Sequence, residues 1–276
     1  NVAINKKSIL KNDKDIVNIG GNIRKTNSAL NIGGENHPVV ICDMSKKTTI
    51  QTIDLLPLGY RYSSKLDKWH ISDRACDYIF IGNSVLDFEI PGTLGVVMNY
   101  KAWKLSQKGY PKLSAKDYLQ NTDFSRKLNF LEIYVDTLDE SILCKIRSDN
   151  TVVLVLNSKS SNTLYEYRKV LNILYSHNIF NPVIINKDYN SINKDRVQIA
   201  ASIDFGSLLL DGLGDGVSFF SSKLPPKFTN NLLFDILQGS RKRISQTEYI
   251  SCPSCGRTLF DLEETTAKIR RKTSHL

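Results

Sequence analysis

The stretch VVLVLNSKSSNTLYEYRKVLNILYSHNIFNPVII, residues Val152 to Ile185, decides the fold. It begins with the aliphatic run Val152–Leu156 and ends with Val183–Ile185, and such runs are typical of strands buried on both faces. Between them, Thr163–His177 has an apolar stripe with helical spacing, and Asn162 is a suitable N-cap. The stripe consists of Leu164, Val170, Leu171 and Leu174. A strand, a helix and a second strand in this order predict a parallel βα unit.

The same alternation extends outward from this unit. Further short apolar runs of the strand type are Val39–Cys42, Tyr78–Ile81, Leu94–Met98, Phe130–Val135 and Leu208–Leu210. Helical patterns cover Leu138–Ile146 and Lys194–Ile203, with Asp139 and Asn193 as caps near their starts. Seven strands over about two hundred residues fit a barrel and an open sheet equally well, because periodicity does not distinguish the two. The fold class is therefore α/β, and its closure stays open on this evidence.

Two changes in composition predict domain borders. Residues 1–36 are polar and glycine-containing, which indicates a linker. Pro225-Pro226 precedes a helical pattern at Asn230–Gly239 and marks the end of the βα region. We therefore expect a linker at 1–36, a barrel-like domain at 37–225 and a separate domain at 226–276.

Two thiols stand in the segment EYISCPSCGRTLFDL, residues 248–262. Cys252 and Cys255 flank a Pro-Ser turn that can direct both sulfurs to one point, and thiolates so placed suit zinc or an iron–sulfur cluster. Thr258 and Asp261 form a capping pair for a helix behind the turn. A lone CxxC motif is only moderately specific. On the motif alone zinc is slightly ahead of iron–sulfur, and a redox dithiol is disfavoured because no thioredoxin-like pattern surrounds it.

The sequence around these thiols also resembles that of a known family. EYISCPSCGRTLFDL, the following KTSHL (272–276) and the upstream LLLDGLGDGV (208–217) together resemble the long, plant-type 4-hydroxy-3-methylbut-2-enyl diphosphate synthases. The resemblance is close over 248–276, looser over 129–217 and faint before that. It implies a modified TIM-type βα barrel, an insert whose closing strand is the LLLDGLGDGV run, followed by the first part of an α+β iron–sulfur domain. The catalytic barrel of the family would precede residue 1, so we expect this chain to be the middle of a larger protein.

The resemblance also implies a chemistry. In the family the Cys-Pro-Ser-Cys pair, Cys252 and Cys255 here, supplies two ligands of a 4Fe–4S cluster, and a third cysteine and a glutamate follow in a segment that this sequence lacks. The implied oxidoreductase takes electrons from ferredoxin or flavodoxin and opens a cyclic diphosphate, 2-C-methyl-D-erythritol 2,4-cyclodiphosphate, in isoprenoid precursor biosynthesis by the non-mevalonate pathway. This chain alone would be inactive. A homodimer, with one chain's cluster domain over another's barrel, is also consistent with the family.

Composition limits the classes of partner and location. The chain carries 37 Lys and Arg against 28 Asp and Glu, a formal charge of +9, which we assign mainly to a solvated surface rather than to nucleic acid. Five cysteines at scattered spacings indicate a reducing compartment, and no apolar run is long enough for a bilayer. Abundant Asn, Lys and Ile are typical of AT-rich genomes, so we expect a plastid or apicoplast stroma, or a bacterial cytoplasm. The basic runs 241–243 and 268–272 flank the thiols and would steer an acidic electron donor.

The remaining groups carry less information. Cys42 and Cys144 lie in apolar patterns and are expected to be buried, and nothing in its spacing recommends Cys76 as a third thiolate. Asp211 and Asp215 are explained by turn chemistry at glycines, and with no arginine after them we expect a structural barrel without a phosphate site. Two alternatives stay open: a basic zinc-ribbon protein that binds RNA, and a non-catalytic βα scaffold whose CxxC is vestigial.

Overall fold

A computed structural model describes residues 24–160, 162–249 and 260–273 of the chain. It divides into two compact units, the first ending at Arg243 and the second beginning at Ile244, and each is described by itself. Cys252 and Cys255 lie outside the described residues.

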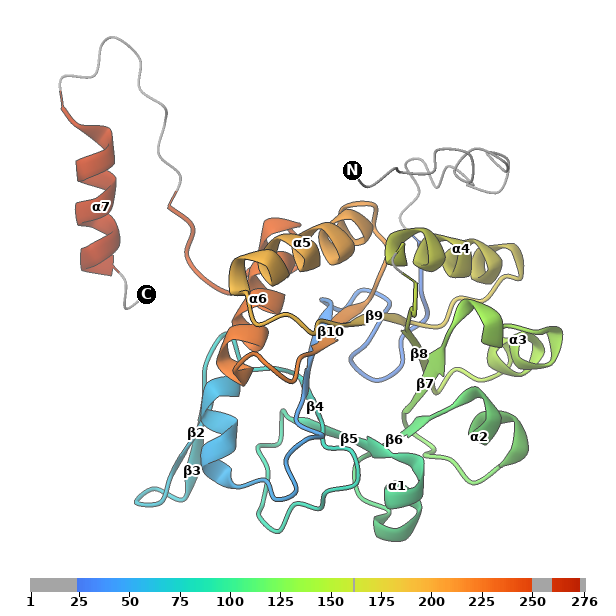
Figure 1. Cartoon of the computed structure of the whole chain (residues 1–276). Helices are drawn as coiled ribbons and strands as arrows, with labels where there is room; N and C mark the ends of the chain where they lie inside the picture. Colours follow the sequence, from blue (N-terminus) through green and yellow to red (C-terminus); the bar gives the residue numbers. More distant parts are fainter. Residues whose placement is uncertain (1–23, 161, 250–259, 274–276) are drawn as a thin grey trace. The chain divides into compact units, whose positions relative to one another are not determined.

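Within the described residues, the first unit is a closed barrel of eight parallel strands (Figure 1). The strands are β1 (Val39–Asp43), β4 (Tyr78–Phe80), β5 (Gly95–Asn99), β6 (Tyr110–Leu113), β7 (Asn129–Ile133), β8 (Val152–Leu156), β9 (Val183–Asp188) and β10 (Gly216–Phe220). Their order around the barrel is β1-β10-β9-β8-β7-β6-β5-β4, and β4 pairs with β1 to close it. This closure confirms the TIM-type barrel and excludes the open sheet.

Helices follow most strands and surround the barrel (Figure 1). They are α1 (Tyr100–Ser106), α2 (Ala115–Gln120), α3 (Glu140–Arg147), α4 (Thr163–Ser176), α5 (Lys194–Leu210), α6 (Pro226–Gly239) and the 3-10 helices η2 (Thr52–Leu58) and η3 (Val135–Thr137). A short hairpin, β2 (Tyr60–Ser63) and β3 (Lys68–Ile71), precedes β4. The three predicted N-caps are confirmed, because Asp139, Asn162 and Asn193 each accept a hydrogen bond from the backbone N–H three residues on.

The strands are buried on both faces, as their composition predicts. On β8, Val153 and Val155 belong to an inner apolar cluster with Phe130 and Ile184, whereas Val152 and Leu154 belong to the outer core that includes the helices. Side chains of successive strand residues point to opposite faces, so one cluster fills the barrel and the other lies between strands and helices.

Residues 24–36 belong to this packed unit, which differs from the predicted linker. Ala29 and Ile32 are buried in the inner cluster with the first residues of the strands. Arg24 donates from Nη2 to the carbonyls of Ile179 and Asn181 at 3.0 and 2.9 Å, and the Tyr78 hydroxyl bonds to the Asn31 side chain. Two apolar positions in a polar segment are too few for a periodic signal, although they are enough to close the bottom of a barrel.

The prediction of a closing strand at Leu208–Leu210 is wrong. These residues form the last turn of α5, and Gly212, with φ of 74°, adopts the left-handed conformation just beyond the helix C-cap. The closing strand is instead β10, from Gly216 to Phe220. Leu208 and Leu209 are buried, whereas Leu210 is 67% exposed. The leucine run therefore packs the end of a helix against the core and does not form a strand buried on both faces.

The helix after Pro225-Pro226 packs on the barrel. Leu232, Leu233 and Phe234 of α6 are buried in the outer core, and α6 contacts β1, η2 and α5. The first compact unit thus extends to Arg243, although the sequence places a domain border near residue 225. In the second unit, α7 (Leu262–Thr273) begins with Asp261, whose Oδ1 accepts from the Glu264 backbone N–H at 2.9 Å; Thr258 lies outside the described residues.

Candidate functional site

The structure describes the residues that come before and after the segment with Cys252 and Cys255, up to 249 and again from 260. The Tyr249 hydroxyl lies 2.6 Å from Thr273 Oγ1 and donates to the Thr273 carbonyl at 3.2 Å. The residue shortly before the predicted turn is therefore bonded to the last turn of α7. The helix itself has no buried residue; Ile269 in it and Phe260 just before it are exposed.

The other three cysteines do not form a second thiol site. Cys42 is buried as predicted and donates from Sγ to Asn230 Oδ1 at 3.2 Å. Cys76 is also buried, and desolvation with the neighbouring Cys42 raises the pKa of its thiol, so it stays protonated. Cys144 is exposed, so its predicted burial is wrong: α3 packs through Ile142, Leu143 and Ile146, and Cys144 falls on the opposite side. Within the described residues, no group of three or more His, Cys, Asp or Glu side chains could hold a metal.

The basic runs that flank the turn are partly used inside the fold. Arg243 donates to both carboxylate oxygens of Asp77, at 2.6 and 3.2 Å, and its guanidinium lies 5.1 Å from the Phe234 ring centre. In α7, Lys268 pairs with Glu264 at 2.7 Å. Arg243 is therefore engaged in a structural ion pair of the barrel, and the docking role of the basic runs stays a prediction.

Asp211 and Asp215 are not brought together as a carboxylate pair. Asp211 forms an ion pair with Arg168. Asp215 precedes β10 and accepts from Thr26 Oγ1 at 2.6 Å and from the Val183 backbone N–H at 2.8 Å. Both lie toward the start of β10, away from the strand ends where active sites of such barrels lie. Their roles are structural, in agreement with the turn interpretation.

A polar cavity of about 200 Å³ lies at the C-terminal ends of the strands, above the inner apolar cluster. We call it the barrel mouth. Most of its polar lining comes from six strands or the residues directly after them: Asp43, Lys112, Glu132, Asn157, Asn186, Asp188 and Ser218; Ser45 and Tyr134 complete it. Interior positions of such barrels are filled mainly by branched apolar residues, so this polar layer is a departure from a purely structural interior.

Contacts within the barrel mouth are unevenly distributed. Lys112 pairs with Glu132 at 2.8 Å, and its ammonium lies 4.2 Å from the Phe80 ring centre. Asn186 donates to Asn157 at 2.5 Å. Asp43 accepts from the backbone N–H and hydroxyl of Ser45 at 2.8 and 2.6 Å. The Asp188 side chain, in contrast, has no hydrogen bond or ion pair with another described residue.

The environment raises the pKa of two of these carboxyls. Burial raises the pKa of Asp43, and the hydrogen bonds from Ser45 offset this only in part. Desolvation raises the pKa of Asp188, and the negative charges of Asp43 and Glu132 add to the effect, while Lys112 opposes it. Carboxylates that share one concave site repel each other and disfavour ionisation.

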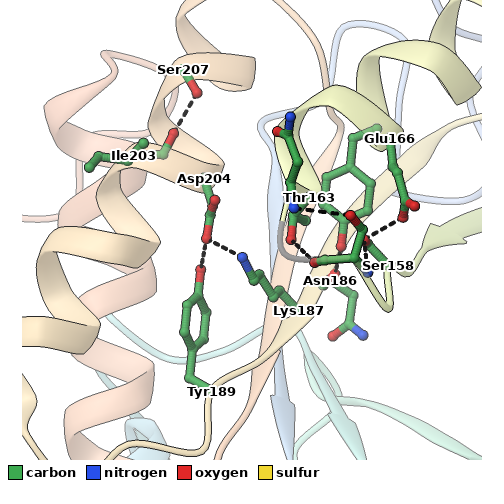
Figure 2. A network of polar contacts seen from close by, with 12 residues as sticks. Ser158, Thr163, Glu166, Asn186, Lys187, Tyr189, Ile203, Asp204 and Ser207 are labelled. Atoms are coloured by element: carbon green, nitrogen blue, oxygen red, sulfur yellow. Dashed lines mark hydrogen bonds and ion pairs between the residues drawn. The ribbon is translucent and has the colours of Figure 1, made fainter. Parts of the chain in front are cut away.

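The fold sets the direction of Asp188, the last residue of β9, through the residues before and after it. Lys187 Nζ and the Tyr189 hydroxyl both donate to Asp204 Oδ2 of α5, each at 2.7 Å (Figure 2). These two bonds hold the residues on either side of Asp188 toward the outer helix, and strand alternation then directs Asp188 into the barrel mouth. Just beyond the end of β8, Ser158 donates to Glu166 of α4 at 2.5 Å, which fixes the residue after Asn157 in the same way (Figure 2).

Comparison with known proteins decides the family. No family model matches the chain. It is 33% identical over 245 residues, 89% of its length, to a 4-hydroxy-3-methylbut-2-en-1-yl diphosphate synthase (flavodoxin) of Parabacteroides distasonis, and 32% identical over 92% of its length to that of Phocaeicola vulgatus. The chloroplastic, ferredoxin-type synthase of Oryza sativa subsp. japonica is 43% identical over 119 residues, which is 43% of this chain. The chain belongs to the 4-hydroxy-3-methylbut-2-en-1-yl diphosphate synthase family.

The match covers only a part of each synthase. It spans 37% and 38% of the two bacterial proteins and 16% of the rice protein. The family resemblance expected from residues 208–276 is confirmed. The zinc-ribbon interpretation gains no support, because the relatives are named as synthases that use flavodoxin or ferredoxin.

Proposed function

We propose that this chain is a segment of a 4-hydroxy-3-methylbut-2-en-1-yl diphosphate synthase that acts on 2-C-methyl-D-erythritol 2,4-cyclodiphosphate, opening its ring and removing a hydroxyl as water. The observation that supports this most is the similarity to two named synthases over 89% and 92% of the chain. On this proposal the chain is inactive alone, since it spans 37–38% of those relatives.

Cys252 and Cys255 would supply two ligands of a 4Fe–4S cluster in the complete protein. Their donor chemistry fits, since two thiolates separated by two residues are soft ligands that iron and zinc both accept. Two ligands are too few to hold a cubane, and the cysteines of the described residues do not add to them, because Cys42 and Cys76 are buried in the barrel and Cys144 lies on α3. When bound, such a cluster supplies single electrons and a Lewis-acidic iron. The third thiolate and a glutamate would come from outside this sequence.

In this proposal the barrel of residues 24–243 does not hold the substrate diphosphate. Among the residues that line its mouth, three carboxylates, Asp43, Glu132 and Asp188, stand against one ammonium, Lys112. A diphosphate in this cavity would be repelled by these carboxylates, and Lys112 is already paired with Glu132 at 2.8 Å. The substrate therefore binds to the catalytic barrel of the complete enzyme, and the barrel described above acts as a spacer toward the cluster domain.

The electron donor would be ferredoxin or flavodoxin, as the names of the relatives suggest. Such donors are acidic, and the basic residues near the thiols would steer them. Lys242 and Arg270 fit this role, because neither has an ion pair with another described residue. The plastid or apicoplast stroma, or a bacterial cytoplasm, is consistent with the chloroplastic relative in rice.

The proposal is tested in the complete protein with single Cys→Ser variants. Cys252→Ser and Cys255→Ser should each abolish turnover of the cyclic diphosphate under anaerobic conditions and remove the brown colour. Cys144→Ser is the matched control, because it removes an exposed thiol remote from the turn in sequence, and it should retain both. Full activity in either turn variant would refute the assignment of these ligands.

A further inference from the structure

We infer that a groove on the outer side of the barrel binds a small amphipathic anion, a molecule with an apolar chain and one anionic head group. The groove lies between the segment 81–94 and helix α1, over the outward-facing residues of β5. It involves neither the thiols nor the barrel mouth, so the inference goes beyond the proposed function and does not rest on it.

The connection from β4 to β5 differs from the other connections of the barrel. Every other barrel strand is followed by an α-helix or a 3-10 helix, whereas the described residues 81–94 contain none (Figure 1). In a βα barrel each strand is normally followed by a helix of the outer ring. Here an irregular segment takes that place: its Leu86, Phe88 and Ile90 are half-buried against the core, and Val85 is 61% exposed. The outer layer of helices is therefore incomplete over β5.

An apolar groove of about 770 Å³ lies where this helix is missing. Pockets that bind small molecules have volumes of about 300–1,000 Å³ and mainly apolar walls. The walls of the groove come from the segment 81–94, β5, α1 and the residues before β7, and they include Phe88, Ile90, Val96, Met98, Trp103 and Phe124. An apolar chain in this groove would be removed from water, which favours its binding.

One end of the groove is positively charged. Lys108 precedes β6, and Arg126 and Lys127 precede the neighbouring strand β7, so all three line the groove at the N-terminal ends of the strands. They are exposed, and none has an ion pair or a side-chain hydrogen bond with another described residue. Asp123 is the one carboxylate in the lining, and the two acidic residues of segment 81–94 are not part of it. Unpaired cations at the end of an apolar groove complement an anionic head group on an apolar chain.

The backbone that carries these cations is held by the fold. Ser125 Oγ accepts from the Lys127 backbone N–H at 3.2 Å, and the buried Asn129 side chain forms two hydrogen bonds with the Ser125 backbone, at 3.0 and 2.8 Å. Trp103 Nε1 donates to the Gly109 carbonyl at 3.2 Å, one residue after the remaining cation. Backbone that is fixed before binding loses little freedom when the ligand binds, which favours affinity.

Isothermal titration calorimetry of the full chain tests the inference with decanoate, decyltrimethylammonium and acetate, all below the concentrations at which micelles form. Decanoate should bind. Acetate should not, because it lacks the chain, and decyltrimethylammonium should bind about tenfold more weakly, because its head group carries the opposite charge. Added salt should weaken decanoate binding through screening. Equal binding of the two ten-carbon probes, equal binding of acetate, or no binding of decanoate at millimolar concentration would each overturn the proposal.

A substitution in the wall locates the apolar chain. Val85→Trp should fill the groove and lower the affinity for decanoate by about tenfold, and the exposure of Val85 leaves room for the larger side chain in the folded protein. Leu105→Trp is the matched control, because Leu105 is 90% exposed on α1 and does not line the groove. It should leave the affinity unchanged, and an equal loss in both variants would refute the assigned position.

Charge reversal locates the head group. The double variant Lys108→Glu/Lys127→Glu should weaken decanoate binding by about tenfold, as expected for two exposed charge contacts, and should not weaken binding of decyltrimethylammonium. Lys65→Glu/Lys169→Glu makes the same change in net charge at exposed positions outside the groove and is the control. Decanoate binding that persists in both the Val85→Trp and the Lys108→Glu/Lys127→Glu proteins, with folding confirmed by circular dichroism, would place the ligand elsewhere and refute the inference.

Discussion

Arg243 and Asp77 form a two-point ion pair, with donor–acceptor distances of 2.6 and 3.2 Å, at the place where the chain leaves the barrel. Asp77 also accepts from the Val40 backbone N–H at 2.8 Å, and Arg243 donates to the Pro38 carbonyl. The pair therefore connects the start of β1, the approach to β4 and the last residue of the first unit. It closes the seam of the barrel where β1 meets β4.

Arg243→Ala should destabilise the barrel by roughly 1–3 kcal/mol, because it leaves the half-buried Asp77 carboxylate without its charged partner. Thermal denaturation checks this value. Lys242→Ala is the neighbouring control and should leave the melting temperature unchanged, while Arg243→Lys should restore only part of the loss, since an ammonium lacks the fork of a guanidinium. Equal melting temperatures for Arg243→Ala and Lys242→Ala would show that the pair contributes nothing.

Gly95→Ala should destabilise the barrel by about 1–3 kcal/mol through overpacking. A Cβ atom at Gly95 would lie 2.3 Å from two carbons of the Tyr78 ring, which fills the inner cluster and contacts Phe130. Gly206→Ala is the matched control: nothing lies within 4 Å of its Cβ position, and as a residue inside α5 it should gain about 0.5–1 kcal/mol. Changes of the same sign in both variants would contradict this account of Gly95.

Asp188→Asn should raise the stability of the unliganded barrel at neutral pH. The folded state raises the pKa of Asp188, so the native protein binds the proton more tightly than the unfolded chain. Stability from this group is therefore present below the ordinary carboxyl pKa and is lost as pH rises through the raised value. Urea denaturation at pH 7 and in acid should show the gain at pH 7 and a smaller one in acid. A variant less stable than the parent at pH 7 would contradict the repulsion among Asp43, Glu132 and Asp188.

Electron transfer in the complete enzyme should respond to charge on Lys242 and Arg270. The double variant Lys242→Glu/Arg270→Glu should slow reduction by the acidic donor at low salt, and the difference should diminish at high salt as screening removes the steering. Stopped-flow kinetics measures it. Lys65→Glu, an exposed residue of the β2–β3 turn, serves as the control. A rate that is the same in both variants at low salt would exclude steering by these residues.

The sequence predicts the βα order well where a signal is local. β8, α4 and β9 are present at the predicted positions, because a long amphipathic helix between two wholly apolar runs allows no other assignment. The leucine run 208–210 is predicted as a strand but ends α5, because the composition of three residues does not distinguish a strand from the buried end of a helix. The strand β6, with the sequence YPKL, carries too few apolar residues to be noticed, and only closure of the barrel reveals it.

The two candidate sites differ in how they could be predicted. Cys252 and Cys255 can be proposed as ligands from sequence because both stand in one short motif. The barrel mouth is assembled from polar residues at the ends of six different strands, such as Asp43 at the end of β1 and Asn157 just after β8. A polar residue at the end of a buried strand can be recognised in the sequence. Only closure of the barrel, which the sequence does not show, brings these residues to one cavity.

Metal analysis of the complete protein, isolated without oxygen, tests the assignment of Cys252 and Cys255 most directly. We predict iron and acid-labile sulfide in equal amounts, both lost in Cys252→Ser and in Cys255→Ser and both retained in Cys144→Ser. Zinc without sulfide, or iron and sulfide that persist when both turn cysteines are replaced, would contradict the cluster assignment.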